Sequence, residues 1–231
     1  GLVMAVTDSS IANVALPTIA RDLHASPAFA IWIVNGYQLA ITISLLPLAS
    51  LGEIFGYRRV YLAGLALFTI ASLLCAFSDS LAGLAIARVV QGFGAAGIMS
   101  VNSALVRFIY PHRILGRGIG INAFVVAVSA ALGPTLASAI LAVGDWPYLF
   151  AVNIPFGVVA LAIGMRALPH SPRKLHPFDW QSALASAATF GFAIGAIDSL
   201  GHGAAPHVYL AEAAIAVLAG ILLVRRQGGS A

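Results

Sequence analysis

The sequence predicts an all-α fold, a polytopic bundle of helices that crosses a membrane about eight times. Three observations predict it. Hydrophobic residues make up 60% of the 231 residues and charged residues only 9%, compared with about 25% charged in an ordinary soluble domain. The apolar residues are gathered into long stretches, and the cations lie almost entirely on one side of the topology that these stretches define. A soluble fold with so few charges could not cover its surface, whereas lipid can.

Each apolar stretch is long enough for one crossing, because a helix needs about 20 residues to span the hydrocarbon core. Short segments rich in Pro, Gly, Asp, His and Arg separate the stretches and leave no room for a soluble domain. The predicted crossings occupy residues 1–19, 30–51, 60–78, 81–106, 118–142, 148–168, 179–200 and 207–224.

The positions of the twelve Lys and Arg residues predict the orientation. Positive residues in short loops stay cytoplasmic, so both ends are expected on the cytoplasmic side of a bacterial plasma (inner) membrane. The opposite side carries only Arg21, and Arg88 lies inside the fourth stretch. Contact with anionic lipid accounts for the net charge of +4 without nucleic acid. The cations on the cytoplasmic side are Arg58, Arg59, Arg107, Arg113, Arg117, Arg166, Arg173, Lys174, Arg225 and Arg226.

Two ionisable residues stand out well inside predicted crossings, where a charge costs roughly 2.5–3.5 kcal/mol. Asp8 is about eleven residues from the outer end of the first crossing, near mid-membrane, and Arg88 is about seven residues inside the fourth. They could form a structural ion pair. They could also couple transport to protons, because burial favours a neutral carboxyl and a nearby arginine favours a charged one. Helix movement could then load and release a proton at Asp8.

Amide side chains also interrupt the apolar crossings. Each is costly against lipid and should face another helix or a cavity. They are candidates for the lining of a substrate path, although any single amide could equally serve interhelical packing, and Asn153 shares the pattern. The candidates for the path are Asn13, Asn35, Gln38, Gln91, Asn102 and Asn122.

Small residues recur every fourth position in the fifth crossing, at Ser129, Gly133 and Ala137. This spacing lets helices approach closely, and Pro134 removes a backbone hydrogen bond and bends the helix. The pattern predicts a tightly packed, bent helix.

Other chemistry has little support in the sequence. The six histidines divide between the two sides, and no His, Cys or carboxylate set has metal-ligand spacing, so no metal or cofactor is expected. The only lysine, Lys174, lies in a loop and cannot hold a retinal Schiff base. Cys75 is expected to be a small buried hydrophobe.

Four ordered motifs resemble those of a known family. Residues 8–17 are similar to Leu-Asp-x-Thr-Ile-Val-Asn-Val-Ala-Leu-Pro, and residues 49–59 resemble Gly-x-Leu-x-Asp-Arg-x-Gly-Arg-Arg. Residues 88–96 are close to Arg-x-x-Gln-Gly-x-Gly-Ala-Ala, and Gly133-Pro134 matches the centre of Gly-x-x-x-Gly-Pro-x-x-Gly-Gly. In these motifs the chain resembles the major facilitator superfamily, specifically its drug:proton antiporters with fourteen helices.

The resemblance implies a division of the chain and a place in a larger transporter. Residues 1–168 would form the N-terminal six-helix half, residues 169–178 a cytoplasmic loop, and residues 179–231 two additional transmembrane helices with a short cytoplasmic tail. A C-terminal half is expected but absent from this chain.

The resemblance also implies roles for two further motifs. A gating motif would comprise Gly52, Glu53, Gly56, Arg58 and Arg59, with Glu53 in place of the family's aspartate. An antiporter motif would comprise Ser129, Gly133, Pro134 and Ala137, with Ser129 and Ala137 in place of glycines.

The implied function is secondary active efflux, in which inward proton movement drives export of a hydrophobic or cationic drug by alternating access. The expected partners are membrane lipid, a small-molecule substrate and protons. A uniporter or symporter of the same superfamily is the nearest alternative. A membrane receptor and a membrane-embedded enzyme are less well supported.

Overall fold

The computed structural model describes residues 1–169, 178–201 and 205–228, and this part of the chain forms helices without strands. Eight helical spans are long and apolar enough to cross a membrane, which confirms the predicted number of crossings. The expected loop at 169–178 falls almost wholly outside the described residues, together with His170, Arg173, Lys174 and His176.

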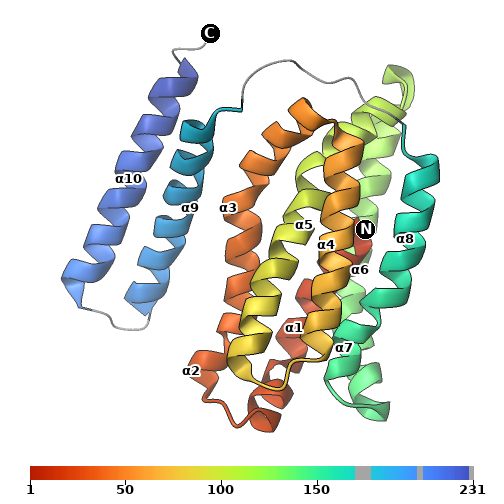
Figure 1. Ribbon diagram of the computed structural model, residues 1–231, viewed down its shortest axis with the longest axis vertical. Helices are drawn as coiled ribbons and strands as arrows, with labels where there is room; N and C mark the ends of the chain where they lie inside the picture. Colours follow the sequence, from red (N-terminus) through yellow and green to blue (C-terminus); the bar gives the residue numbers. More distant parts are fainter. Residues whose placement is uncertain (170–177, 202–204, 229–231) are drawn as a thin grey trace.

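The helical bounds follow the predicted stretches closely (Figure 1). The long helices are α1 (Leu2–Asp22), α3 (Trp32–Phe55), α4 (Tyr57–Ala76), α5 (Leu81–Ile109), α6 (Leu115–Val143), α9 (Trp180–Gly201) and α10 (Pro206–Gly228). The sixth crossing is divided into α7 (Pro147–Ala151) and α8 (Asn153–Ala167). The connections contain the short α2 (Pro27–Ala30) and a 3₁₀ turn, His112–Ile114.

The division of the sixth crossing has a local cause. Proline has no N–H group and cannot donate to the carbonyl four residues earlier. Pro155 therefore leaves the carbonyl of Ala151 without its helical donor, and the chain turns at Val152 between α7 and α8. Hydropathy averages over this break, so the sequence predicted one continuous helix.

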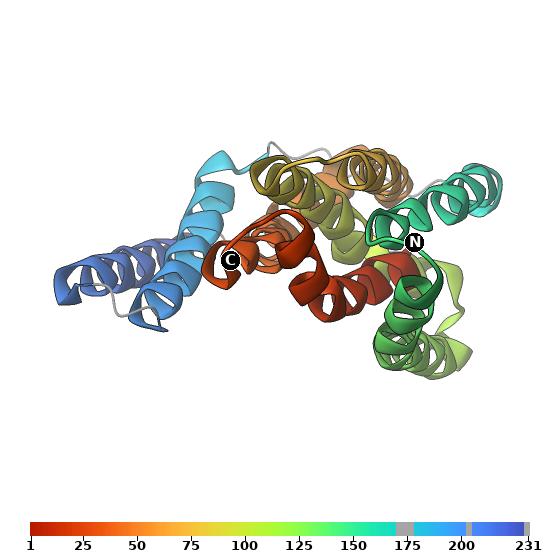
Figure 2. The same cartoon turned by 90° about the horizontal axis from the view of Figure 1, so that it is seen from below.

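Helix α5 lies in the middle of the first six crossings and packs most extensively against α3 and α4 (Figures 1 and 2). Glycines permit this close approach. A Cβ atom added to Gly92 would lie 2.6 Å from the carbonyl oxygen of Tyr37, and one added to Gly64 would lie 2.8 Å from that of Gly94. Because the backbones approach this closely, only the hydrogen side chain of glycine fits at these two positions.

The turn between α3 and α4 consists of Gly56 alone. Its φ of 97° lies where only glycine is comfortable, and its N–H donates to the carbonyl of Gly52 at 3.0 Å. The chain thus reverses direction within one residue, which holds the ends of α3 and α4 together.

Helices α9 and α10 form a hairpin beside the first six crossings (Figure 1). Helix α9 packs along α3, and α10 packs along α9. In Figure 2 the hairpin extends from one side of the bundle.

The buried side chains of the six-crossing bundle form two hydrophobic clusters at different heights. One contains Ile11, Ile33, Cys75 and Ala87, and the other contains Ala5, Ile41, Phe68 and Ala95. Each of α1, α3, α4 and α5 contributes to both clusters. Polar residues at the intermediate positions of these helices therefore lie between two apolar layers.

Candidate functional site

A buried polar layer separates the two hydrophobic clusters. It contains Asp8 on α1, Ser72 on α4, Arg88 and Gln91 on α5, and Asn153 at the start of α8. Each of these residues is at most 5% exposed. The layer therefore connects four helices through side chains that water does not reach in this conformation.

Asp8 is the acceptor at the centre of the layer. Its Oδ2 pairs with Nη1 of Arg88 in a fully buried ion pair. Its Oδ1 accepts hydrogen bonds from Nδ2 of Asn153 at 2.6 Å and from Nε2 of Gln91 at 3.0 Å. Three donors from two other helices thus stabilise the charged carboxylate.

Arg88 is held by more than its ion pair. Its Nε donates to the backbone carbonyl of Ile33 on α3 at 3.2 Å. The guanidinium carbon lies 4.0 Å from the ring centre of Tyr37 and 5.5 Å from that of Phe150, distances at which aromatic faces attract a cation. Within the described residues, Nη2 has no hydrogen-bond partner. The cation is therefore enclosed but keeps one donor available for a new acceptor.

Gln91 joins both members of the ion pair to α4. Its Oε1 accepts from Nη1 of Arg88 at 2.6 Å, while its Nε2 donates to Asp8 and to Oγ of Ser72, the latter at 2.9 Å. Ser72 in turn donates to the carbonyl of Phe68 at 2.8 Å. Gln91 was predicted to line the substrate path, but in this conformation it is completely buried.

The other amides predicted for the path lie elsewhere. Asn13 on α1 and Gln38 on α3 are exposed, and Asn35 is partly exposed. Asn102 on α5 donates to Oδ1 of Asn122 on α6 at 2.9 Å. The Asn102–Asn122 pair therefore joins α5 to α6 directly. Asn13, Gln38 and Asn35 instead present polar groups on faces that the described chain leaves at least partly uncovered.

The predicted antiporter motif packs against the helix that carries Asp8. Ser129, Gly133 and Ala137 are the buried positions along the middle of α6, and Pro134 is exposed. A Cβ atom added to Gly133 would collide with Cβ of Ser10. Thr7 donates to the carbonyl of Ser129 at 3.3 Å.

The predicted gating motif surrounds the turn between α3 and α4. Gly52 and Gly56 are buried, Glu53 is partly buried, and Arg59 is exposed. A Cβ atom added to Gly52 would lie 3.1 Å from Cδ1 of Tyr57. Arg58 donates to the carbonyl of Met165, which joins α4 to the end of α8.

Sequence reasoning noted Asn153 as a polar residue but did not select it as a site residue, and it missed Ser72 and Tyr37. A serine in an apolar helix commonly bonds to the carbonyl four residues earlier, as Ser72 does, so its residue type gives no sign of a second partner. Within the described residues, no group of His, Cys, Asp or Glu could hold a metal ion.

Protonation of Asp8 would alter the balance of charge in this layer. A neutral carboxyl no longer compensates Arg88, and an arginine cannot lose its proton. Removing one member of a buried ion pair typically costs about 3–5 kcal/mol.

Comparison with known proteins places these residues in a wider family. The family model of the Major Facilitator Superfamily matches residues 1–196. The uncharacterized transporter YebQ of Escherichia coli (strain K12) is 55% identical over 98% of this chain and 50% of its own length.

Two further relatives have more specific names. The riboflavin transporter RibZ of Clostridioides difficile (strain 630) is 36% identical over 73% of this chain and 37% of its own length. The tetracenomycin C resistance and export protein of Streptomyces glaucescens is 36% identical over 77% of this chain and 33% of its own length. The chain thus spans about a third to a half of the curated relatives that it matches.

Proposed function

The chain belongs to the major facilitator superfamily of membrane transporters, and we propose that it forms the proton-coupling part of a drug:proton antiporter. It is an integral multi-pass membrane protein. Because the family and the named relatives are transporters, the enzyme alternative is excluded. The single observation that carries the proposal is the buried ion pair of Asp8 and Arg88 between two apolar layers.

The proposed cycle starts from the charged carboxylate. Asp8 holds Arg88 on α5 and accepts from Asn153 on α8, so the charged state ties three helices together. A proton that arrives at Asp8 cancels its charge and weakens these bonds. Because the uncompensated Arg88 is costly in a buried site, the proton favours a second arrangement of the helices. Release of the proton on the other side of the membrane restores the first.

Helix α1 is suited to transmit this change. Asp8 is on the face that meets α5 and α8, whereas Thr7 and Ser10 are on the face that meets α6. A shift of α1 at the ion pair must therefore be accommodated at the seam with Ser129 and Gly133. This coupling supports a role for the antiporter motif as the seam along which α1 and α6 move during alternating access.

We assign the remaining parts of the chain on the same basis. Residues 1–168 form the N-terminal half, residues 169–178 a cytoplasmic loop, and residues 179–231 two additional helices. The distribution of cations favours a cytoplasmic position for both ends, at the bacterial inner membrane. The exposed amides Asn13 and Gln38 face the substrate path, opposite a C-terminal half supplied by the rest of the transporter.

The proposed substrate is a hydrophobic or cationic drug. The relative named as a tetracenomycin C resistance and export protein supports export of a drug. The substrate would bind the arrangement of the helices in which Asp8 is charged, and it would be released when a proton on Asp8 favours the other arrangement. Proton and substrate would then compete for one state of the protein, which is the requirement for antiport.

Proton and substrate fluxes measured together test the mode of transport. The full-length transporter is reconstituted into vesicles with an acidic interior and a trapped pH indicator, and ethidium or tetraphenylphosphonium is added outside. Antiport predicts that the added cation enters while protons leave. Entry without proton movement identifies a uniporter, and entry accompanied by protons in the same direction identifies a symporter. Either result contradicts the proposed mode.

A second candidate is a transporter of a different small solute, by uniport or symport. It is favoured by the relative that is named a riboflavin transporter. Replacing the cation with riboflavin in the same vesicles and measuring its entry distinguishes the two candidates, because an antiporter of cationic drugs should not take up this solute.

A further inference from the structure

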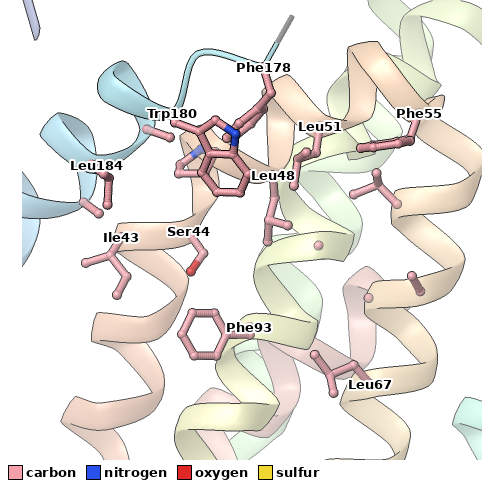
Figure 3. Close-up of a pocket in the computed structure, with 17 residues that line it drawn as sticks. Ile43, Ser44, Leu48, Leu51, Phe55, Leu67, Phe93, Phe178, Trp180 and Leu184 are labelled. Carbon is pink, nitrogen blue, oxygen red and sulfur yellow. The ribbon is translucent and has the colours of Figure 1, made fainter. Parts of the chain in front are cut away.

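An apolar groove (Figure 3) has a volume of about 550 Å³, and its lining includes neither Asp8 nor Arg88. Its walls come from α3, α4, α5 and the start of α9. The walls are hydrophobic except for Ser44, whose hydroxyl lies among the apolar side chains (Figure 3). The groove opens to the outside of the bundle, since Phe55, Trp180 and Leu184 are each more than half exposed.

The dimensions of the groove decide what can fill it. On α3 its lining runs from Ile43 to Phe55, a distance of about 18 Å at about 1.5 Å per residue. One leaflet of the hydrocarbon core is about 15 Å thick, half of a core of about 30 Å. The length of the groove therefore matches an acyl chain within one leaflet.

One end of the groove has the features of a membrane interface. Phe178 and Trp180 meet there edge to face, with ring centres 4.6 Å apart, and tryptophan is enriched at the level of lipid headgroups. Arg59 is exposed at the start of α4. Residues 59, 63 and 67 share one helical face, and Ala63 and Leu67 line the groove. A cation therefore lies above the end where a headgroup would sit.

From this arrangement we propose that the groove binds one anionic phospholipid, with an acyl chain along α3 and α9 and the phosphate near Arg59. The cation supplies the charge complementarity, and the two aromatic rings mark the depth of the headgroup. Because α9 forms one wall, the bound lipid joins the α9–α10 hairpin to the first six crossings. The site is separate from the buried ion pair and does not depend on the direction of transport.

A photoactivatable lipid tests this site in the full-length transporter. Phosphatidylglycerol with a diazirine on one acyl chain is added at low proportion to phosphatidylcholine vesicles, and the labelled peptides are mapped by mass spectrometry. The site predicts labelling concentrated on α3 and α9 at the groove. Unlabelled phosphatidylglycerol should compete at least fivefold better than extra phosphatidylcholine. This competition needs no variant and remains decisive if a variant fails to fold.

Four variants refine the test. Ala183→Phe and Ala187→Phe fill the groove and should each reduce its labelling several-fold, while Ala162→Phe, on an exposed face of α8, should leave the labelling unchanged. Arg59→Gln should remove the preference for phosphatidylglycerol. Uniform labelling around the whole protein, equal competition by both lipids, or a groove protected from lipid by another protein segment would each overturn the proposal.

Discussion

Asp8 accepts hydrogen bonds from Gln91 and Asn153 in addition to its ion pair with Arg88. These additional bonds influence how the ion pair responds to substitution. Gln91 and Asn153 both donate to the same carboxylate oxygen, so the charged form is stabilised even if the cation moves. Arg88 depends more on its partner, because its Nη2 has no acceptor among the described residues. The two residues are therefore unequal members of the pair.

Thermal unfolding in detergent should reveal this inequality. Asp8→Asn leaves a buried guanidinium that cannot lose its proton, and we expect a loss of about 3–5 kcal/mol. Arg88→Gln leaves a carboxylate that can take up a proton, so its loss should be smaller and should diminish as the pH falls. The double variant should be more stable than Asp8→Asn alone. Additive losses, or an Asp8→Asn variant as stable as the wild type, would show that the pair does not stabilise the fold.

The sequence could predict the members of this site better than their arrangement. Hydropathy identified Asp8 and Arg88, because a charge in an apolar stretch is conspicuous, and Gln91 was selected as an amide in an apolar stretch. The pairing itself joins residues 80 positions apart, and helical periodicity does not state which helix a face will meet. Tyr37 and Ser72 were missed for the same reason, since their contacts with Arg88 and Gln91 come only from packing.

At the scale of helices, glycines allow neighbouring helices to pack closely. A Cβ atom added to these glycines would collide with a side chain at one position and with a backbone at another. A Cβ atom on Gly133 of α6 would collide with the side chain of Ser10 on α1, and its next contact, with the carbonyl oxygen of Thr7, is an acceptable 3.4 Å. A Cβ atom on Gly94 of α5 would collide with the backbone of Phe68 on α4. A side chain can be shortened by substitution, and a backbone cannot.

Substitution and rescue test this distinction. Gly133→Ala should lower the melting temperature and slow transport, since overpacking costs about 1–3 kcal/mol. Adding Ser10→Gly should restore most of both losses. Ala131→Leu, on an exposed part of α6, serves as a control and should be tolerated. If Ser10→Gly gave no recovery, the close contact between Gly133 of α6 and Ser10 of α1 would be wrong.

Gly94→Ala should behave differently. It forces α4 and α5 apart, and shortening the side chain of Phe68 should add a cavity without removing the collision. We therefore expect the variant Gly94→Ala with Phe68→Ala to be less stable than either single variant. Recovery of the melting temperature in the double variant would contradict the close backbone contact between these helices.

The single-residue turn at Gly56 supports a third prediction at this scale. Its φ of 97° is strained for any residue with a Cβ atom, at a cost of about 1–3 kcal/mol. Gly56→Ala should lower the melting temperature, while Ala49→Gly within α3 should have a smaller effect. Equal effects would show that the turn tolerates a side chain.

At the scale of the whole molecule, composition and charge were sufficient to predict the number of crossings, because the membrane demands long apolar helices. They could not predict the break at Val152, which depends on the single residue Pro155, or the short α2. They also could not predict that the α9–α10 hairpin packs along α3, because lipid and a neighbouring helix both accept an apolar face.

The orientation of the chain can be measured by the accessibility of introduced cysteines. Cys75 is buried and is first replaced by serine. In that background, Asp79→Cys should react with an impermeant maleimide added to intact cells, and Arg113→Cys should react only after the membrane is opened. Both native residues are exposed in connections at opposite ends of the bundle. The reverse pattern would invert the proposed topology.

The central claim is that Asp8 exchanges the transported proton, and proton exchange by Asp8→Asn tests it most directly. The full-length variant is reconstituted into vesicles with an acidic interior and compared with the wild type and with Asp79→Asn, which changes an exposed carboxylate. We predict that ethidium releases protons from vesicles containing the wild type or Asp79→Asn but not from those containing Asp8→Asn. Proton release by Asp8→Asn at the rate of the wild type would contradict the claim.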